Sequence, residues 1–363
     1  MATPDYVLYR PDVETVPADE PQTIAKILES MHRLMGRTQE QAGRAIRVSH
    51  AKSHGAAIGE LEVYEGLVEP LRQGLFAQAG RYPVIVRLAN VPGEIDPDSV
   101  NTQRGLSFKV LGVQGEMLAD HAGGTTQDFV LDTGDRFPAA DAKAFLVTHL
   151  TLEHAPQTPS AVKAAVSAVS RATNKALHAI GVDSANMDFF GHSHVHPLAE
   201  AYFSQAALRW GDYIAKLAVV PVSPQQEAME GSKVDDKDPD GLRKATVGYL
   251  RDNDAEFEVR VQLCTNLKTM PVENANTEWK EDESPYLPVG RLRLPRQNAY
   301  SPARAAYVDD ALSFCVSHCL EAHRPLGSIQ RARLAAYPHM ARARFQANGR
   351  ALAEPRAIEE VPA

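Results

Sequence analysis

Three residues near the C-terminal end have the types and the spacing for metal chemistry. Arg333, Tyr337 and Arg344 stand at offsets of zero, four and eleven, which at about 100° per residue place them within about 40° of one another on a helix. A tyrosine binds ferric iron as the phenolate, a form that its ordinary pKa of about 10 disfavours. Arg333, one turn away, would favour that form, and Arg344 has the donor fork that suits a ligand carboxylate. An exposed basic helix with one buried tyrosine would show the same pattern.

A run of histidines offers an alternative metal site. His192, His194 and His196 alternate, so in a strand their imidazoles would share one face. No carboxylate is arranged beside them, and such runs are more often polar loops, so this site is the weaker hypothesis.

The cysteines point to a reducing compartment, because Cys264, Cys315 and Cys319 are too few for a disulfide framework. Cys315 and Cys319 fall in an apolar stretch that we expect to be helical. We therefore interpret them as buried structural thiols and not as metal ligands.

The elements that must position these residues include three helical regions. Apolar residues recur at helical spacing from Pro21 to Arg44, and an Ala-rich helix is expected from Ser160 to Ala179. The portion from Ala303 to Ala351 is helical by pattern and is broken near Pro325 and Gly327. Pro338 disfavours helical geometry at Tyr337, so we expect the last helix to begin or kink there.

The expected strands are rich in alternating or β-branched apolar residues. They are Gly55–Tyr64, Tyr82–Asn90, Leu106–Val113, Asp128–Leu131, Tyr213–Val222, Ala245–Arg251, Glu256–Cys264 and Val289–Leu294. The stretch Ser223–Lys244 reads as a solvated loop. Strands on both sides of a helical excursion predict an α+β domain with a largely antiparallel sheet or barrel.

The composition excludes several classes of function. A net charge of −8 over 363 residues argues against a nucleic-acid or anionic-membrane surface, because both need clustered cations. The N-terminal residues resemble no signal peptide, and no apolar stretch reaches spanning length, so we expect a cytoplasmic protein that acts on a small molecule.

The C-terminal constellation resembles the proximal signature of haem catalases, in which Arg-x-x-x-Tyr-Pro is followed by His and Arg residues. Further segments resemble catalase segments in the order of that family. These are the distal segment Arg47–Gly59, the propionate-binding strand Val86–Glu94, the Arg-Gly-Phe-Ala-Val-Lys strand at Arg104–Val110, the Asn-Thr-Pro-Phe-Phe segment at Thr126–Asp132 with Phe137 downstream, and a late strand region with Asn274, Glu278, Trp279 and Ser284-Pro285.

The resemblance covers about residues 20–345 and implies a catalase-like antiparallel β-barrel with surrounding helices. Haem b would be buried between the barrel and the C-terminal helix. We expect a single domain over residues 1–363, without the C-terminal flavodoxin-like domain of large catalases, as in the compact catalase-related peroxidases.

The resemblance also implies roles for individual residues. Tyr337 matches the iron ligand, with Arg333 beside it. His50 matches the distal histidine, whose imidazole suits the transfer of a peroxide proton. Phe137 matches an aromatic residue on the haem face. The residues that match the propionate-binding arginines are Arg47, Arg87 and Arg344.

Departures from the catalase pattern are concentrated on the distal side. No asparagine aligns in Gly123–Gln127 without a gap, so Thr125 or Gln127 would have to supply the missing donor. Ala89 stands where catalases usually have a serine, and Ser49 places a hydroxyl beside His50, as in the allene oxide synthase branch. Because a shift of about 1 Å costs on the order of 10²-fold in rate, we expect no strong dismutation of hydrogen peroxide.

The function implied is a haem-dependent peroxidase that acts on hydrogen peroxide or an organic hydroperoxide and takes electrons from an organic donor. A hydroperoxide-rearranging or peroxide-using enzyme of the allene oxide synthase type is the alternative, and a catalytically weak haem sensor is another. The resemblance also implies a homo-oligomer, either a dimer or a tetramer.

Overall fold

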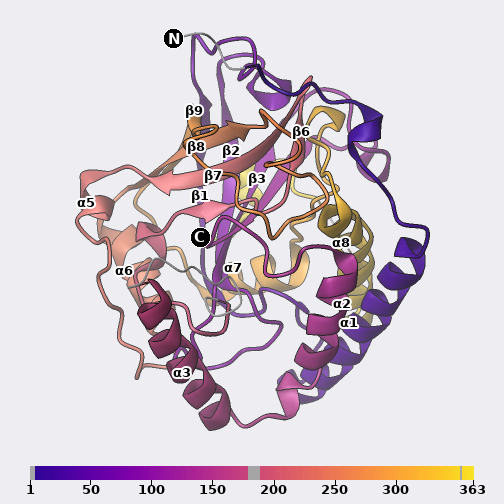
Figure 1. The fold of residues 1–363 in the computed structure, drawn as a ribbon. Coiled ribbons are helices and arrows are strands. Elements are labelled where there is room, and N and C mark those ends of the chain that lie inside the picture. Colours follow the sequence, from indigo (N-terminus) through magenta and orange to yellow (C-terminus); the bar gives the residue numbers. More distant parts are fainter. Residues whose placement is uncertain (1–4, 179–188, 352–353) are drawn as a thin grey trace.

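The computed structural model describes residues 5–178, 189–351 and 354–363. Its strands form one curved sheet, and its helices lie around this sheet (Figure 1). The expected α+β class is confirmed.

Eight strands close into an antiparallel barrel in the order β5-β4-β3-β2-β1-β9-β8-β7, and β6 pairs with β7 beside it. Closure is brief, because β5 pairs with β4 only at Asp132↔Phe203 and with β7 over two residues. The strands are β1 (Ser53–Val63), β2 (Gly80–Asn90), β3 (Arg104–Leu111), β4 (Thr126–Asp132), β5 (Tyr202–Phe203), β6 (Leu208–Trp210), β7 (Tyr213–Pro221), β8 (Ala255–Leu263) and β9 (Leu287–Leu294).

Successive side chains of each strand point alternately into the barrel interior and toward its outer face. On β4, Phe129 and Leu131 point into the main apolar core, as do Leu106 and Phe108 on β3. The intervening residues therefore face outward, toward the helices. This outer face of β2, β3 and β4 carries the polar side chains considered below.

Three helices pack side by side against that outer face: α1 (Glu20–Ala42), α2 (Ala142–Leu152) and α8 (Ser328–Ala347) (Figure 1). A second apolar cluster joins them, with Met31 and Met35 of α1 and Met340 of α8 among its buried members. Helix α8 continues through Pro338, so it does not begin there.

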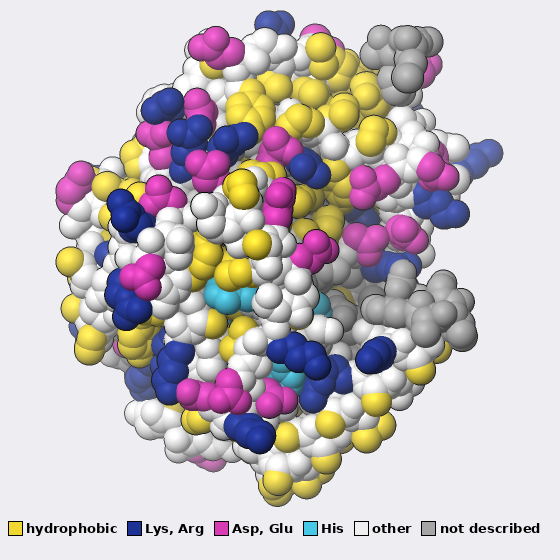
Figure 2. Space-filling model, turned by 90° about the vertical axis from the view of Figure 1, so that its left-hand side faces the viewer, with side chains coloured by type: hydrophobic (Ala, Val, Ile, Leu, Met, Phe, Trp, Pro, Cys, Tyr) yellow, Lys and Arg dark blue, Asp and Glu magenta, His cyan; other side chains and the backbone are white. Residues whose placement is uncertain are grey.

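The remaining helices are α3 (Ser160–His178), α5 (Pro224–Glu227), α6 (Gly241–Asp252) and α7 (Pro302–Ala306), which runs into a π-helical turn at Tyr307–Ala311. On the face in Figure 2, cationic and anionic side chains are interspersed, and those drawn in colour form no continuous basic surface. Across the described segments, no helix has both the length and the apolar character needed to cross a bilayer.

Three expectations about elements were wrong. Ala245–Arg251 belongs to α6 and is not a strand. Within Ser223–Lys244, the structure has α5 and the first turn of α6 as well as loop. Cys315 and Cys319 lie in a turn region and not in a helix, although both are buried free thiols as expected.

Candidate active site

A cavity of about 390 Å³ lies between the outer face of the barrel and the helical layer, and a smaller one of about 100 Å³ adjoins it. His50 comes from the segment before β1 and Tyr337 from α8, so the barrel and the helices each contribute a wall. The residues common to both cavities are Met31, Val48, Ser49, His50, Ala336 and Tyr337.

His50 is buried, and its backbone is hydrogen-bonded to the residues that directly follow β2. Its N–H donates to the Val91 carbonyl at 2.7 Å, and the Ser49 hydroxyl donates to the same carbonyl at 3.0 Å. Burial, together with the charges of Arg87, Arg333 and Arg47, lowers the pKa of His50 to about 3. The imidazole is therefore neutral at physiological pH and able to accept a proton.

Tyr337 and Arg333 lie on the cavity side of α8, as their spacing predicts. The Tyr337 hydroxyl makes no hydrogen bond with any of the described residues. Burial raises the pKa of Tyr337, and the charge of Arg333 opposes this shift. Arg333 itself lies over the Phe137 ring, 5.4 Å from its centroid. Phe137 also lines the larger cavity.

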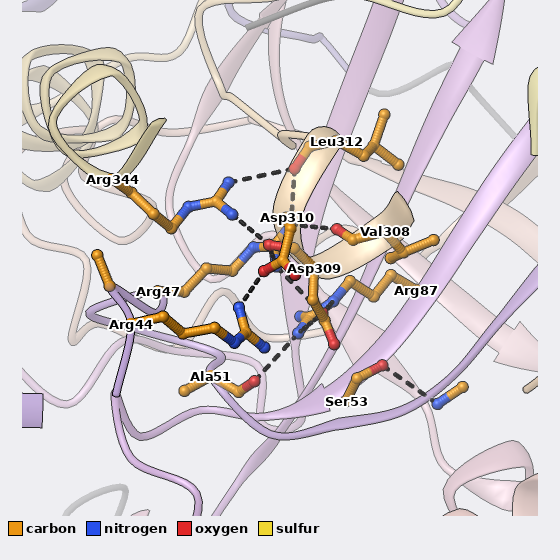
Figure 3. Close-up of polar contacts among 12 residues, drawn as sticks. Arg44, Arg47, Ala51, Ser53, Arg87, Val308, Asp309, Asp310, Leu312 and Arg344 are labelled. Atoms are coloured by element: carbon orange, nitrogen blue, oxygen red, sulfur yellow. Dashed lines mark hydrogen bonds and ion pairs between the residues drawn. The ribbon is translucent and has the colours of Figure 1, made fainter. Parts of the chain in front are cut away.

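An arginine cluster borders the smaller cavity (Figure 3). Arg47 and Arg87 donate to the Asp309 carboxylate at 3.1 and 3.0 Å, and Arg344 donates to the Asp309 and Leu312 carbonyls. Arg44 pairs with Asp310 at the rim. Burial and the charges of Arg87 and Arg344 lower the pKa of Arg47 well below its ordinary value, as expected where cations outnumber anions.

The residues expected to replace the distal asparagine are not at the cavity. Thr125 is exposed and directly precedes the first residue of β4. Gln127 points into the barrel, where its Oε1 accepts from the Leu320 N–H at 2.9 Å. The assignment of Thr125 and Gln127 to the distal site is therefore wrong, because strand alternation turns Gln127 away from the helices.

Asp132, which the sequence reasoning missed, takes the position opposite His50. Its Oδ1 lies 3.6 Å from His50 Nε2, and its Oδ2 lies 3.4 Å from Arg333 Nη2. The register of the hairpin puts Asp132 opposite Gly105 and Asp128 opposite Lys109. Pairing the oppositely charged Lys109 and Asp128 in the sequence would have given this register and would have moved the alignment by several residues.

The histidine run does not form a metal site. His192 bonds Glu200, His194 bonds the Asp98 carbonyl, and His196 accepts from the Leu198 N–H. No group of three or more potential ligands converges anywhere in the described parts of the chain.

The sequence matches no protein-family model and no curated protein sequence. Its structure resembles solved catalases. A fungal catalase has a TM-score of 0.61 at 18% identity, with 85% of this chain and 61% of that chain covered. For catalase A from Saccharomyces cerevisiae the TM-score is 0.58 at 16% identity, with 85% and 64% covered.

A bacterial catalase is similar to the same degree, with a TM-score of 0.56 at 15% identity and coverage of 84% of this chain and 59% of that one. The chain spans less than two thirds of the length of each of these catalases. The closed antiparallel barrel and these likenesses together show that the chain has a catalase-like fold.

Proposed function

We propose that the chain is a haem-dependent oxidoreductase that acts on hydrogen peroxide or an organic hydroperoxide, with Tyr337 as the iron ligand. The observation that carries the proposal is the pairing of His50 and Tyr337 on the walls of the same two cavities. One wall thus offers a neutral proton acceptor, and the other offers a phenol of the kind that binds ferric iron.

The residues around the cavities fit a haem group in three respects. The Tyr337 hydroxyl faces the cavity without a hydrogen-bond partner among the described residues. Asp132 Oδ1 and Arg333 Nη1 are buried polar atoms that also lack one. At the smaller cavity, the surplus positive charge of the arginine cluster suits propionate groups, because buried cations require anionic partners.

When bound, haem supplies an iron centre that exchanges electrons with the O–O bond of a peroxide. The protein supplies the remaining functions. His50 accepts the hydroperoxide proton at an imidazole nitrogen, and Arg333 favours the phenolate of Tyr337. Arg47, Arg87 and Arg344 bind the propionates, and the apolar lining excludes water.

The electronic spectrum of the haem-reconstituted protein tests the iron ligand. We expect a five-coordinate ferric tyrosinate spectrum in the wild type, and we expect Tyr337→Phe to lose it and to bind haem at least about tenfold more weakly. Tyr286→Phe is the matched control, because this partly buried tyrosine lies outside both cavities. A Tyr337→Phe spectrum identical to the wild-type spectrum would refute the assignment.

The lining of the larger cavity favours a bulky organic hydroperoxide over hydrogen peroxide. Away from His50, this lining includes the apolar side chains of Phe145, Leu152 and Val166, which suit an apolar organic group. The proposal therefore extends to peroxidation or rearrangement of such a compound.

Comparison of three substrates tests this preference. With hydrogen peroxide, tert-butyl hydroperoxide and a fatty-acid hydroperoxide, we expect kcat/KM to rise with the size of the apolar group. Product analysis then separates reduction to the alcohol from rearrangement. The highest kcat/KM with hydrogen peroxide would contradict the preference, and spectral change without turnover of any substrate would favour a sensor.

A further inference from the structure

Asp132 has a buried carboxyl group, and only one of its two oxygens has a side-chain partner. It is 3% exposed, and its Oδ1 has no hydrogen-bond partner among the described residues. His50 Nε2 lies 3.6 Å from Oδ1, which is beyond hydrogen-bond distance. A buried carboxyl oxygen without a partner is destabilising, so the fold retains this group at the expense of stability.

The surroundings of Asp132 leave room for a small polar group. Its cross-strand partner on β3 is Gly105, which has no side chain. A Cβ at Gly105 would lie 2.5 Å from His50 Nδ1 and 3.0 Å from Asp132 Oδ1. The missing side chain at Gly105 therefore lets the imidazole lie close to the carboxyl group. Both groups line the larger cavity, and this cavity is the space from which a small polar group can reach them.

We propose that Asp132 is a substrate-binding residue of this site, and that its Oδ1 and the His50 imidazole together hold the O–O–H group of a hydroperoxide. This inference rests on the proposed function. An oxygen on the cavity side of the pair, beside and not between the two atoms, can lie at about 2.8 Å from both, although they do not hydrogen-bond to each other. The substrate thus satisfies the carboxyl oxygen that the fold leaves without a partner.

A carboxyl group has a property here that an amide lacks, because it changes between donor and acceptor with pH. Burial raises the pKa of Asp132 to about 6, against the opposing charge of Arg333. The other titratable groups that face it are His50 and Tyr337 across the cavity and Tyr202 on β5. His50 stays neutral above pH 3, so the change near pH 6 belongs to the carboxyl.

The sign of the pH effect follows from the charge. Below pH 6 the protonated carboxyl donates a hydrogen bond to the hydroperoxide, which in turn donates to the neutral imidazole. Above pH 6 the carboxylate accepts only, and it repels any anion in the cavity. We expect the wild-type KM for tert-butyl hydroperoxide to rise as the pH passes through about 6.

The test compares wild type with Asp132→Asn in the haem-loaded protein. We expect Asp132→Asn to keep the KM of wild type at pH 5, because its amide is a donor at every pH, and to remove the pH dependence near 6. Asp132→Ala has no donor, so it should raise KM about three- to tenfold at pH 5, the effect of one hydrogen bond. Asp132→Ser, which also lacks the charge, gives a second reading if the first variant folds poorly. Asp252→Asn is the control, because this exposed carboxyl is remote from the cavities.

Cyanide binding, followed by the haem absorption band, gives a readout that is independent of turnover. We expect the cyanide affinity of wild type to fall as the pH rises through 6 and that of Asp132→Asn to stay level. If Asp132 only anchors Arg333, the substitution will alter the haem spectrum but leave both pH profiles unchanged, which would overturn the inference. A wild type without a tyrosinate spectrum or turnover would overturn the proposed function as well.

Discussion

His50 has a backbone conformation that few residues other than glycine adopt, with φ at +56°. Hydrogen bonds from His50 N–H to Val91 and from Ala51 N–H to Pro92 hold this conformation. Strain of this kind persists only where the surroundings impose it, and it is frequent at functional sites. The imidazole is therefore fixed by the backbone on one side and by the space above Gly105 on the other.

Gly105→Ala tests this placement of His50. The added Cβ would lie 2.5 Å from His50 Nδ1, so the imidazole must move. We expect turnover with tert-butyl hydroperoxide to fall about 10²-fold, and stability to fall by about 1–3 kcal/mol. Gly36→Ala is the control, since a Cβ at this exposed helical position meets nothing within 4 Å, and it should retain activity and gain up to about 1 kcal/mol. Unchanged turnover in Gly105→Ala would show that the position of His50 does not matter.

At the residue scale, the sequence predicted one wall of the site better than the other. Arg333, Tyr337 and Arg344 share one helix, so their spacing alone brings them together. The opposite wall combines His50 with Asp132, which are distant in sequence. They meet because the segment before β1 pairs with the residues after β2, and β2, β3 and β4 are neighbours in the sheet. The match of Thr126–Asp132 with the catalase segment therefore assigned no role to Asp132.

At the scale of elements, a fully buried ion pair fixes the register of the β3–β4 hairpin. Lys109 Nζ lies 2.7 Å from Asp128 Oδ1 and 2.6 Å from Glu354 Oε2, and Lys109 and Asp128 are cross-strand partners. Burial alone would lower the pKa of Lys109, but the two carboxylates raise it. The pair therefore stays charged, and it aligns Asp132 with Gly105 at the end of the same ladder.

We expect Lys109→Met to cost about 3–5 kcal/mol, because it leaves Asp128 buried without its cation. Urea denaturation measures this loss. The double variant Lys109→Met/Asp128→Leu should recover part of it, since no unpaired charge then remains on the strands. Lys26→Met, at an exposed position on α1, should change stability by less than about 0.5 kcal/mol. A loss below about 1 kcal/mol in Lys109→Met would show that the pair does not hold the hairpin.

The helix α6 shows why one element was predicted incorrectly. Thr246, Val247 and Tyr249 are residues typical of strands, and they suggested a strand over Ala245–Arg251. A wider window contains Leu242, Thr246 and Leu250, which are buried at intervals of four and bury one face of a helix. The Thr246 hydroxyl donates to the Leu242 carbonyl at 2.9 Å, so its polar group is satisfied within the helix.

At the scale of the whole molecule, the cavity separates two apolar cores. One fills the barrel, and the other joins α1, α2 and α8. The strand pattern left a sheet or a barrel open, and the resemblance to catalases predicted the barrel, which the structure confirms. The pattern alone could not give the closure, because this depends on the two-residue strand β5. A cofactor bound between the two cores would contact both, and its binding energy would add to their association.

Haem binding should therefore stabilise the helical layer more than the barrel. A ligand present at 100 times its Kd stabilises the folded state by about 2.7 kcal/mol. Most of this stabilisation should be found in the helical layer, because side-chain packing alone holds that layer to the barrel when no ligand is bound. Hydrogen exchange with and without haem measures it. We expect slower exchange in α1 and α8, which line the cavities, and little change in β7 and β8, which pair on the far part of the barrel. Tyr337→Phe should reduce the difference, because it removes the bond from α8 to the iron. Equal protection of both cores would instead indicate that haem binds elsewhere or that the two cores already unfold as one cooperative unit.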